Sequence, residues 1–154
     1  MQRKLDQVDN KILMELQKDA RISHQELSEK VGLSATPCTR RIRNLEKEGY
    51  IQGYSAKIDE AKMGFGFTVF VSVQLDFQIE ERLMNFENEI QDLPEVVDCW
   101  LMTGNRDYLL RLALSDLKEF ERFLTGRLTK IGGVKSIESS IPIRSVKEQM
   151  TRLL

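Results

Sequence analysis

Histidine, cysteine and proline are scarce in this chain of 154 residues, which has one histidine, two cysteines and three prolines. The histidine, His24, belongs to no Ser/His/Asp or Cys/His pattern, and Cys38 and Cys99 form no CxxC pair and have no metal-ligand spacing. We therefore expect no catalytic residues, no metal and no cofactor. Both cysteines are expected to be buried core thiols.

The chain also lacks long apolar runs and a large net charge. No run approaches the roughly 18 apolar residues of a membrane span, and the first residues, MQRKLDQVDNK, lack the apolar core of a signal peptide. We expect no membrane partner and a cytoplasmic protein. Because the formal net charge is −1, binding to an acidic polymer through overall charge is excluded, and any basic surface has to be local.

Two short amphipathic helices joined by a tight turn are predicted for SHQELSEKVGLSATPCTRRIRNLEK, residues 23–47. Ser23 with Glu26 three positions later forms a capping box, so a helix begins at Ser23. Gly32 can take the left-handed conformation that ends a helix. This arrangement is typical of a helix-turn-helix motif.

The second helix of the motif is expected from about Ala35 to Glu48. Ser34 is its predicted cap, Pro37 lies in its first turn, and Gly49 marks its end. At about 100° per residue, one stripe of this helix is apolar and packs, whereas the opposite stripe is polar and cationic.

The polar stripe suits the major groove of DNA, because small hydroxyl side chains permit close approach and arginine can bond guanine in a bidentate fork. The alternative is an ordinary solvated helix face beside Glu46 and Glu48, but the tight turn and the paired caps favour DNA binding. Arg41 and Lys47 are expected on or near the phosphates. The full set of expected DNA-binding residues is Ser34, Thr36, Pro37, Thr39, Arg40, Arg41, Arg43, Asn44 and Lys47.

A further helix should precede the motif, since apolar residues repeat at helical spacing between Leu5 and Leu16, after a cap at Asp6. After Gly49, residues 50–58 (YIQGYSAKI) predict a short strand, either a wing or a connector. We therefore expect a helix-turn-helix domain at residues 1–59, a hinge at 60–66, and a second domain at 67–154.

The second domain begins where the apolar period changes from 3.6 to 2, with a long alternating strand from Phe67 to Phe77. A helix follows and ends at Leu93–Pro94. Strands at 96–103 and 108–114 are joined by a short loop and should pair antiparallel. A helix opened by Asp116 and a last strand at 134–143 complete the order β-α-β-β-α-β. The fold class is α+β.

One face of such a sheet is left uncovered by its own helices. The outward positions Phe70, Trp100, Met102 and Leu109 are more apolar than a solvated face should be. A second copy of the sheet is the natural cover, so the protein should be at least a homodimer. Two-fold symmetry then predicts pseudo-palindromic sites in double-stranded DNA, with half-sites about 34 Å apart or multiples of it.

The motifs LDQVDNKIL (5–13), RISHQELSEKVGLSATPCTRRIRNLEKEGYIQGYSAKID (21–59) and MTGNRDYLLRL (102–112) closely resemble the Lrp/AsnC family of leucine-responsive and asparagine regulators. The resemblance covers essentially the whole chain. It implies a winged helix-turn-helix domain followed by a βαββαβ ferredoxin-like domain, called RAM. It also implies a sequence-specific transcription regulator that senses a small effector, usually an amino acid, and whose dimers assemble into octamers.

The resemblance places the effector site around a G-x-x-D loop, here Gly104 to Asp107, with Ser139–Ile141 contributed by a facing dimer. Glycine lets backbone N–H groups approach a carboxylate, and an aspartate can pair with an α-ammonium group. Taken alone, the loop is better explained by an ordinary hairpin turn capped by Asp107, with two surface serines, and only the match over the whole chain favours an effector site. The implied effector-binding residues are Thr103, Gly104, Asn105, Arg106, Asp107, Tyr108, Ser139, Ser140 and Ile141.

Two other functions are considered. Siroheme decarboxylases resemble members of this family, and acylphosphatases share the βαββαβ order, but the chain shows no cluster of reactive groups, so we do not expect an enzyme. An architectural DNA-binding protein without an effector is the other alternative, and ligand titration distinguishes it from a sensor.

Overall fold

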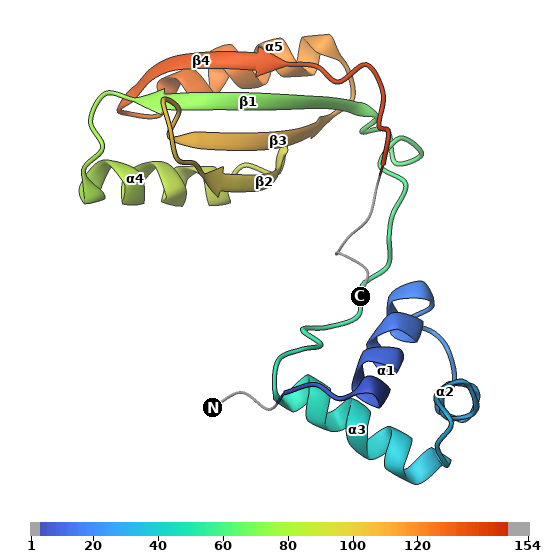
Figure 1. The fold of residues 1–154 in the computed structure, drawn as a ribbon. Helices are drawn as coiled ribbons and strands as arrows, with labels where there is room; N and C mark the ends of the chain where they lie inside the picture. The colour runs from blue at the N-terminus through green and yellow to red at the C-terminus, as the bar shows by residue number, and fades with distance from the viewer. Residues whose placement is uncertain (1–3, 148–154) are drawn as a thin grey trace. The chain divides into compact units, whose positions relative to one another are not determined.

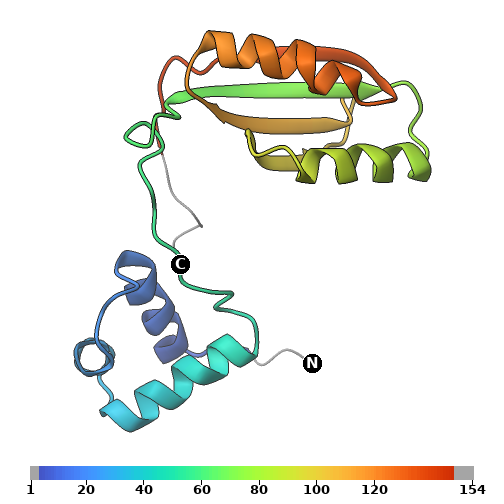
Figure 2. The same ribbon diagram turned by 180° about the vertical axis from the view of Figure 1, so that it is seen from behind.

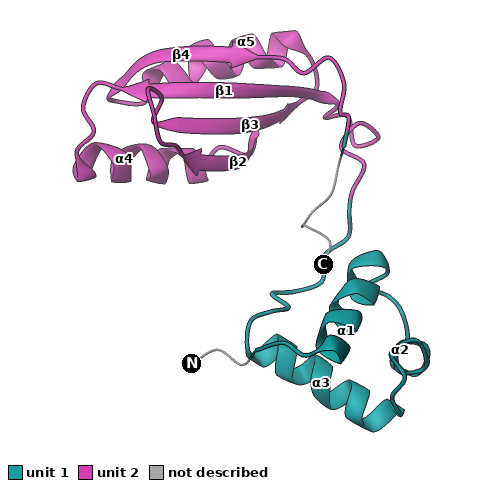
Figure 3. Cartoon of the chain, in the orientation of Figure 1, with its two compact units in different colours: residues 1–57, 147–154 teal, residues 58–146 magenta. Residues whose placement is uncertain are grey.

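The computed structural model describes residues 4–147, which divide into one compact unit containing residues 4–57 and 147 and another containing residues 58–146 (Figure 3). Residues 1–3 and 148–154, which the sequence assigns to the ends of the two expected domains, lie outside the described residues.

The N-terminal unit is built from three helices, and their starts follow the sequence signals. Asp6 caps the first helix, and Ser23 caps the second in a capping box with Glu26, as expected. Gly32 ends the second helix with a left-handed φ of 74°. The helices are α1 (Gln7–Lys18), α2 (His24–Val31) and α3 (Ala35–Lys47) (Figure 1).

For this unit, one expectation is confirmed only in part and another is wrong. Ser34 occupies the N-cap position of α3, but its side chain makes no capping hydrogen bond. The residue three positions later is Pro37, which has no N–H for the hydroxyl to accept from. The strand expected at residues 50–58 is absent, and this segment has no regular secondary structure. A strand needs a neighbour for its backbone N–H and C=O groups, and this segment pairs with none of the described strands.

The packing stripe of α3 is confirmed. Cys38, Ile42 and Leu45 are all buried, in one cluster with residues of α1 and α2. Arg41 also joins α3 to the start of α1 through ion pairs. Its Nη1 lies 2.6 Å from Asp6 Oδ2 and 2.8 Å from Asp9 Oδ1. Asp9 is fully buried. The backbone N–H of Asp9 and the Arg41 guanidinium lower the pKa of the Asp6 carboxyl.

The C-terminal unit is the expected βαββαβ sandwich. Its four strands lie in the order β2-β3-β1-β4, and every neighbouring pair is antiparallel. Both α-helices cover the same face of the sheet, which is seen from its two sides in Figure 1 and Figure 2. The elements are β1 (Phe67–Leu75), α4 (Glu80–Gln91), β2 (Val96–Leu101), β3 (Tyr108–Leu114), α5 (Leu117–Gly126), the 3₁₀ turn η1 (Leu128–Lys130) and β4 (Val134–Ser140).

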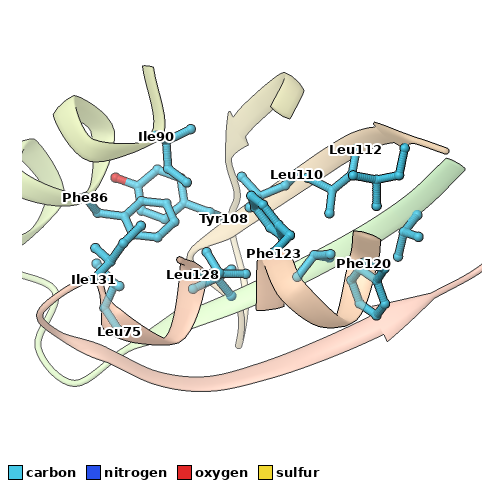
Figure 4. Close-up of a cluster of buried hydrophobic side chains, with 14 residues drawn as sticks. Leu75, Phe86, Ile90, Tyr108, Leu110, Leu112, Phe120, Phe123, Leu128 and Ile131 are labelled. Atoms are coloured by element: carbon cyan, nitrogen blue, oxygen red, sulfur yellow. The ribbon is translucent and has the colours of Figure 1, made fainter. Parts of the chain in front are cut away.

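The core of this unit lies between the sheet and the helices (Figure 4). Alternate residues of β1 and β3 point into it, as the period of 2 predicts, and their burial alternates strictly along β3. Phe86 of α4 packs on Tyr108 of β3 with ring centroids 4.5 Å apart. Phe120 and Phe123 of α5 fill the other half of the layer.

Several boundaries are shorter than expected. β1 ends at Leu75 because neither neighbouring strand pairs beyond that residue, so Phe77 lies outside it and is exposed. β4 ends at Ser140, and Ile143, expected in the last strand, is fully exposed. Cys99 is exposed rather than buried, since β2 is an edge strand. Among residues 4–147, no helix is long and apolar enough to cross a membrane.

The side chain of Arg41 should stabilise the N-terminal unit, whereas that of Arg43 on the exposed stripe of α3 should not. Replacing Arg41 by Ala removes an ionic partner of the buried Asp9, so we expect a loss of about 1–3 kcal/mol of unfolding free energy. Arg43→Ala, which changes the same residue type at an exposed position, should stay within about 0.5 kcal/mol of the parent. Urea unfolding followed by circular dichroism measures both, and equal stabilities would contradict the assignment.

Candidate DNA interface and effector site

The polar stripe of α3 is presented to solvent. Thr36, Arg40, Arg43 and Lys47 are exposed, and Asn44 is half-buried. Because Cys38, Ile42 and Leu45 fix the opposite stripe in the core, the helix cannot rotate to hide these cations. The stripe therefore offers donors to a partner on the outer side of the helix.

Two members of the expected DNA-binding set have partners inside the unit. Thr39 Oγ1 lies 3.1 Å from Nδ1 of His24, the first residue of α2. Arg41 is directed at the carboxylates of α1 rather than outward. These ion pairs give Arg41 a role in holding α3 on α1, in place of a side chain directed outward to phosphates.

The loop between β2 and β3 is anchored at its base. The N–H of Met102 donates to the carbonyl of Asp107 at 2.8 Å, and the N–H of Asp107 donates to the carbonyl of Val73 at 2.8 Å. The tip, with Thr103, Gly104 and Asn105, is exposed. Gly104 has a φ of +110°, a conformation that an L side chain rarely adopts.

Asp107 lies inside this loop and only 3% of it is exposed. Its Oδ2 accepts from the backbone N–H of Leu75 at 2.6 Å, and its Oδ1 accepts from the side-chain amide of Gln78. The carboxylate expected to pair with an effector's ammonium group is therefore enclosed within the chain. In this structure both oxygens have partners from the end of β1 and the segment after it.

Arg106 points the other way, across the sheet. Its Nη1 donates to Ser136 Oγ at 2.6 Å and its Nη2 donates to Glu138 Oε2 at 2.8 Å. Both partners belong to β4, two strands away from β3. The loop is thus tied to β1 through Asp107 and to β4 through Arg106.

The remaining expected effector residues do not gather at the loop within one chain. Tyr108 is a core residue whose hydroxyl donates to Glu87 at 2.8 Å. Its burial, followed by that bond, raises its pKa. Ser139 and Ser140 pair with Val71 and Phe70, whereas the loop meets β1 at Val73. Ile141 follows β4 and is exposed.

Among residues 4–147, no group of three His, Cys, Asp or Glu side chains is placed to hold an ion. The side chains and backbone groups of both sites offer hydrogen bonds and charge pairing. The α3 stripe suits anionic, groove-shaped partners, and the loop combines exposed backbone with a buried carboxylate.

Comparison with known families decides between a general helix-turn-helix protein and a regulator with a sensing domain. A model of winged helix-turn-helix DNA-binding domains matches residues 5–52, and a model of the Lrp/AsnC ligand binding domain matches residues 68–152. The chain belongs to the Lrp/AsnC family. It is a transcriptional regulator with a DNA-binding helix-turn-helix and a ligand-binding domain.

Individual relatives of this Lrp/AsnC protein match it over nearly the whole chain. It is 48% identical over 142 residues to the Bkd operon transcriptional regulator of Pseudomonas aeruginosa, covering 92% of this chain and 93% of that protein. It is 38% identical over 144 residues to the leucine-responsive regulatory protein of Escherichia coli, covering 94% and 88%. A Neisseria meningitidis transcriptional regulator, solved as a complex with L-methionine, superposes with a TM-score of 0.91 at 33% identity and covers 96% and 95%.

Three further contacts of this Lrp/AsnC chain were not foreseen from its sequence. His24 contacts α3 through Thr39, Gln78 donates to Asp107, and Glu60 accepts from Arg111 at 3.1 Å. The partners are 15, 29 and 51 residues apart in sequence. No local pattern marks such pairs, because each depends on how distant elements meet.

Proposed function

We propose that this protein is an amino-acid-responsive regulator that reads DNA with the exposed stripe of α3 and binds its effector at the loop of residues 103–107. The observation that carries the proposal is the buried carboxylate of Asp107 at an exposed, glycine-containing turn of the ligand-binding domain. A buried carboxylate is the natural partner of an α-ammonium group. Support also comes from relatives that are named leucine-responsive or solved with L-methionine.

DNA recognition is assigned to the N-terminal half and centre of α3. Small residues at its start permit close approach to base edges, and the arginines that follow reach guanine. Lys47, near the end of the helix, suits a phosphate contact. The proposed groove residues are Ser34, Thr36, Pro37, Thr39, Arg40, Arg43 and Asn44.

Removing either exposed arginine of α3 should weaken specific binding without unfolding the protein. We expect Arg40→Ala and Arg43→Ala each to cost about 1–3 kcal/mol on a cognate promoter fragment and to relax sequence preference at one position. Fluorescence anisotropy on cognate and scrambled duplexes measures the effect, with Lys118→Ala on the exposed surface of α5 as the control. Unchanged cognate affinity in both arginine variants would show that another face reads DNA.

The effector's carboxylate is assigned to backbone N–H groups near Gly104 and its ammonium to Asp107. Ser139 or Ser140 is assigned to the effector's polar end from a facing dimer, because the strand register keeps these serines away from the loop of their own chain. A thermal-shift screen of the amino acids identifies the effector, since a ligand that binds only the folded protein raises its melting temperature. If no amino acid produces a shift, the architectural alternative is favoured.

Asp107→Asn tests the ammonium assignment with little change in shape. The asparagine oxygen still accepts from Leu75, and its amide donates to the oxygen of Gln78 once that amide turns over. We expect affinity for the amino acid found in the screen to fall about 10- to 150-fold, the worth of a charged hydrogen bond. Calorimetry measures the loss, while promoter binding without effector should be unchanged. Equal effector affinity in the variant and the parent would place the pocket elsewhere.

Assembly is assigned to the face of the sheet opposite the helices. The register places Trp100, Leu109 and Ser72 in one row across that face, and 45% of Trp100 is exposed. Arg111 on the same face is paired with Asp98 at 2.7 Å and with Glu60, so its charge is compatible with being covered. A second copy of this face makes a dimer, and dimers assemble further into an octamer.

A charge placed in the centre of this face should separate the two copies. We expect Trp100→Glu to give a particle with the 17.9 kDa mass of one chain, because two carboxylates would face each other in a dry interface. Leu101→Glu is the matched control. Its side chain is exposed but points to the other side of the same strand, so the dimer should persist. Light scattering measures both, and a monomeric parent protein contradicts the proposed assembly.

A further inference from the structure

At the proposed effector site, the carboxylate of Asp107 is not accessible to an ammonium group. Asp107 is 3% exposed, so an ammonium cannot reach either of its oxygens unless a group of the protein moves. The bond from Leu75 comes from the backbone of β1, within the hydrogen-bonded sheet. The other bond comes from the side chain of Gln78, an exposed residue. Only the second partner can leave without disturbing the sheet.

The backbone around Gln78 is anchored on both sides. The N–H of Asp76 donates to the carbonyl of Gly133 at 2.8 Å, and the carbonyl of Ile79 accepts from the N–H of Arg82 at 3.0 Å at the start of α4. The segment itself therefore stays in place when the glutamine side chain rotates. Rotation of an exposed side chain is fast and small in scale.

The glutamine amide and an α-ammonium group offer the same thing to a carboxylate oxygen, namely an N–H donor at hydrogen-bond distance. The ammonium adds a full positive charge, which makes the bond stronger. Without an effector this oxygen still needs a donor, because a buried carboxylate without one is costly. Gln78 supplies that donor from within the chain.

We propose that Gln78 is a built-in competitor of the effector: its amide occupies the ammonium position on Asp107 and leaves when an amino acid binds. The inference rests on the proposed function and assigns Gln78 the part of setting effector affinity. It predicts that removal of the Gln78 side chain increases effector affinity, whereas removal of a side chain that contacts a ligand decreases it.

The experiment titrates L-leucine and L-methionine into the full chain by calorimetry. Gln78→Ala and Gln78→Met both remove the amide, and the second keeps the length of the side chain. Each should tighten binding about 10- to 150-fold, the worth of one hydrogen bond to a charged group. Gln78→Lys tethers a permanent ammonium beside Asp107 and should weaken binding. Gln91→Ala, an exposed glutamine at the opposite end of α4, is the control and should leave the affinity unchanged.

Thermal unfolding gives a second readout. Without amino acid, Gln78→Ala should melt below the parent protein because Asp107 has lost a donor. A saturating concentration of the amino acid should reduce this difference in melting temperature, since its ammonium group replaces the missing amide as a donor to Asp107. A purely structural role for Gln78 would keep the difference constant.

The outcomes separate this inference from the proposed function. Weaker binding by Gln78→Ala and Gln78→Met means that Gln78 contacts or shapes the effector site and overturns the competitor role. Unchanged affinity in all Gln78 variants together with loss in Asp107→Asn also overturns it, but leaves the effector site standing. Absence of binding by both the parent and Gln78→Ala contradicts both.

Discussion

A single sheet with its helices on one side leaves the other side to be covered by something else, and this constraint governs the C-terminal unit. Alternation along β1 and β3 sends Val71 and Leu110 into the core and Phe70 and Leu109 to the open side. The core face needs nothing beyond this chain. The open face combines half-buried and exposed apolar residues with paired charges, a composition that is compatible with contact to a second copy.

Local signals were enough to place most elements. Asp6, Ser23 and Gly32 set helix ends because a cap acts on the backbone of its own helix, and the period of 2 located the strands because burial alternates with it. Ser34 shows the limit of a residue-type rule, since its side chain makes no capping bond and Pro37, three positions later, has no N–H to donate. The strand expected at 50–58 failed because pairing depends on a partner that the segment itself does not encode.

The candidate sites were predictable as positions but not as contacts. The exposed stripe of α3 follows from helical phase alone. The role of Arg41 does not, because its partners on α1 lie 32 and 35 residues away. Asp107 was expected as the partner of an ammonium group, and only the folded chain shows that Leu75 and Gln78 enclose it. Long-range polar pairs of this kind are set by packing, which a pattern of residue types does not record.

Adjacent residues of the effector loop connect it to two different parts of the sheet. Asp107 bonds the end of β1, and Arg106 bonds Ser136 and Glu138 of β4. Ser136 in turn donates to Gln74 of β1 at 3.1 Å. By the register, Ser136 and Glu138 lie on the open face with Gln74 and Ser72. Under the proposed function, an amino acid that changes the partner of Asp107 acts on a loop in which the adjacent residue, Arg106, is bonded to side chains of the assembly face. Binding and assembly then share a free energy of coupling, and linkage requires it to be reciprocal, so that assembly changes effector affinity by the same factor.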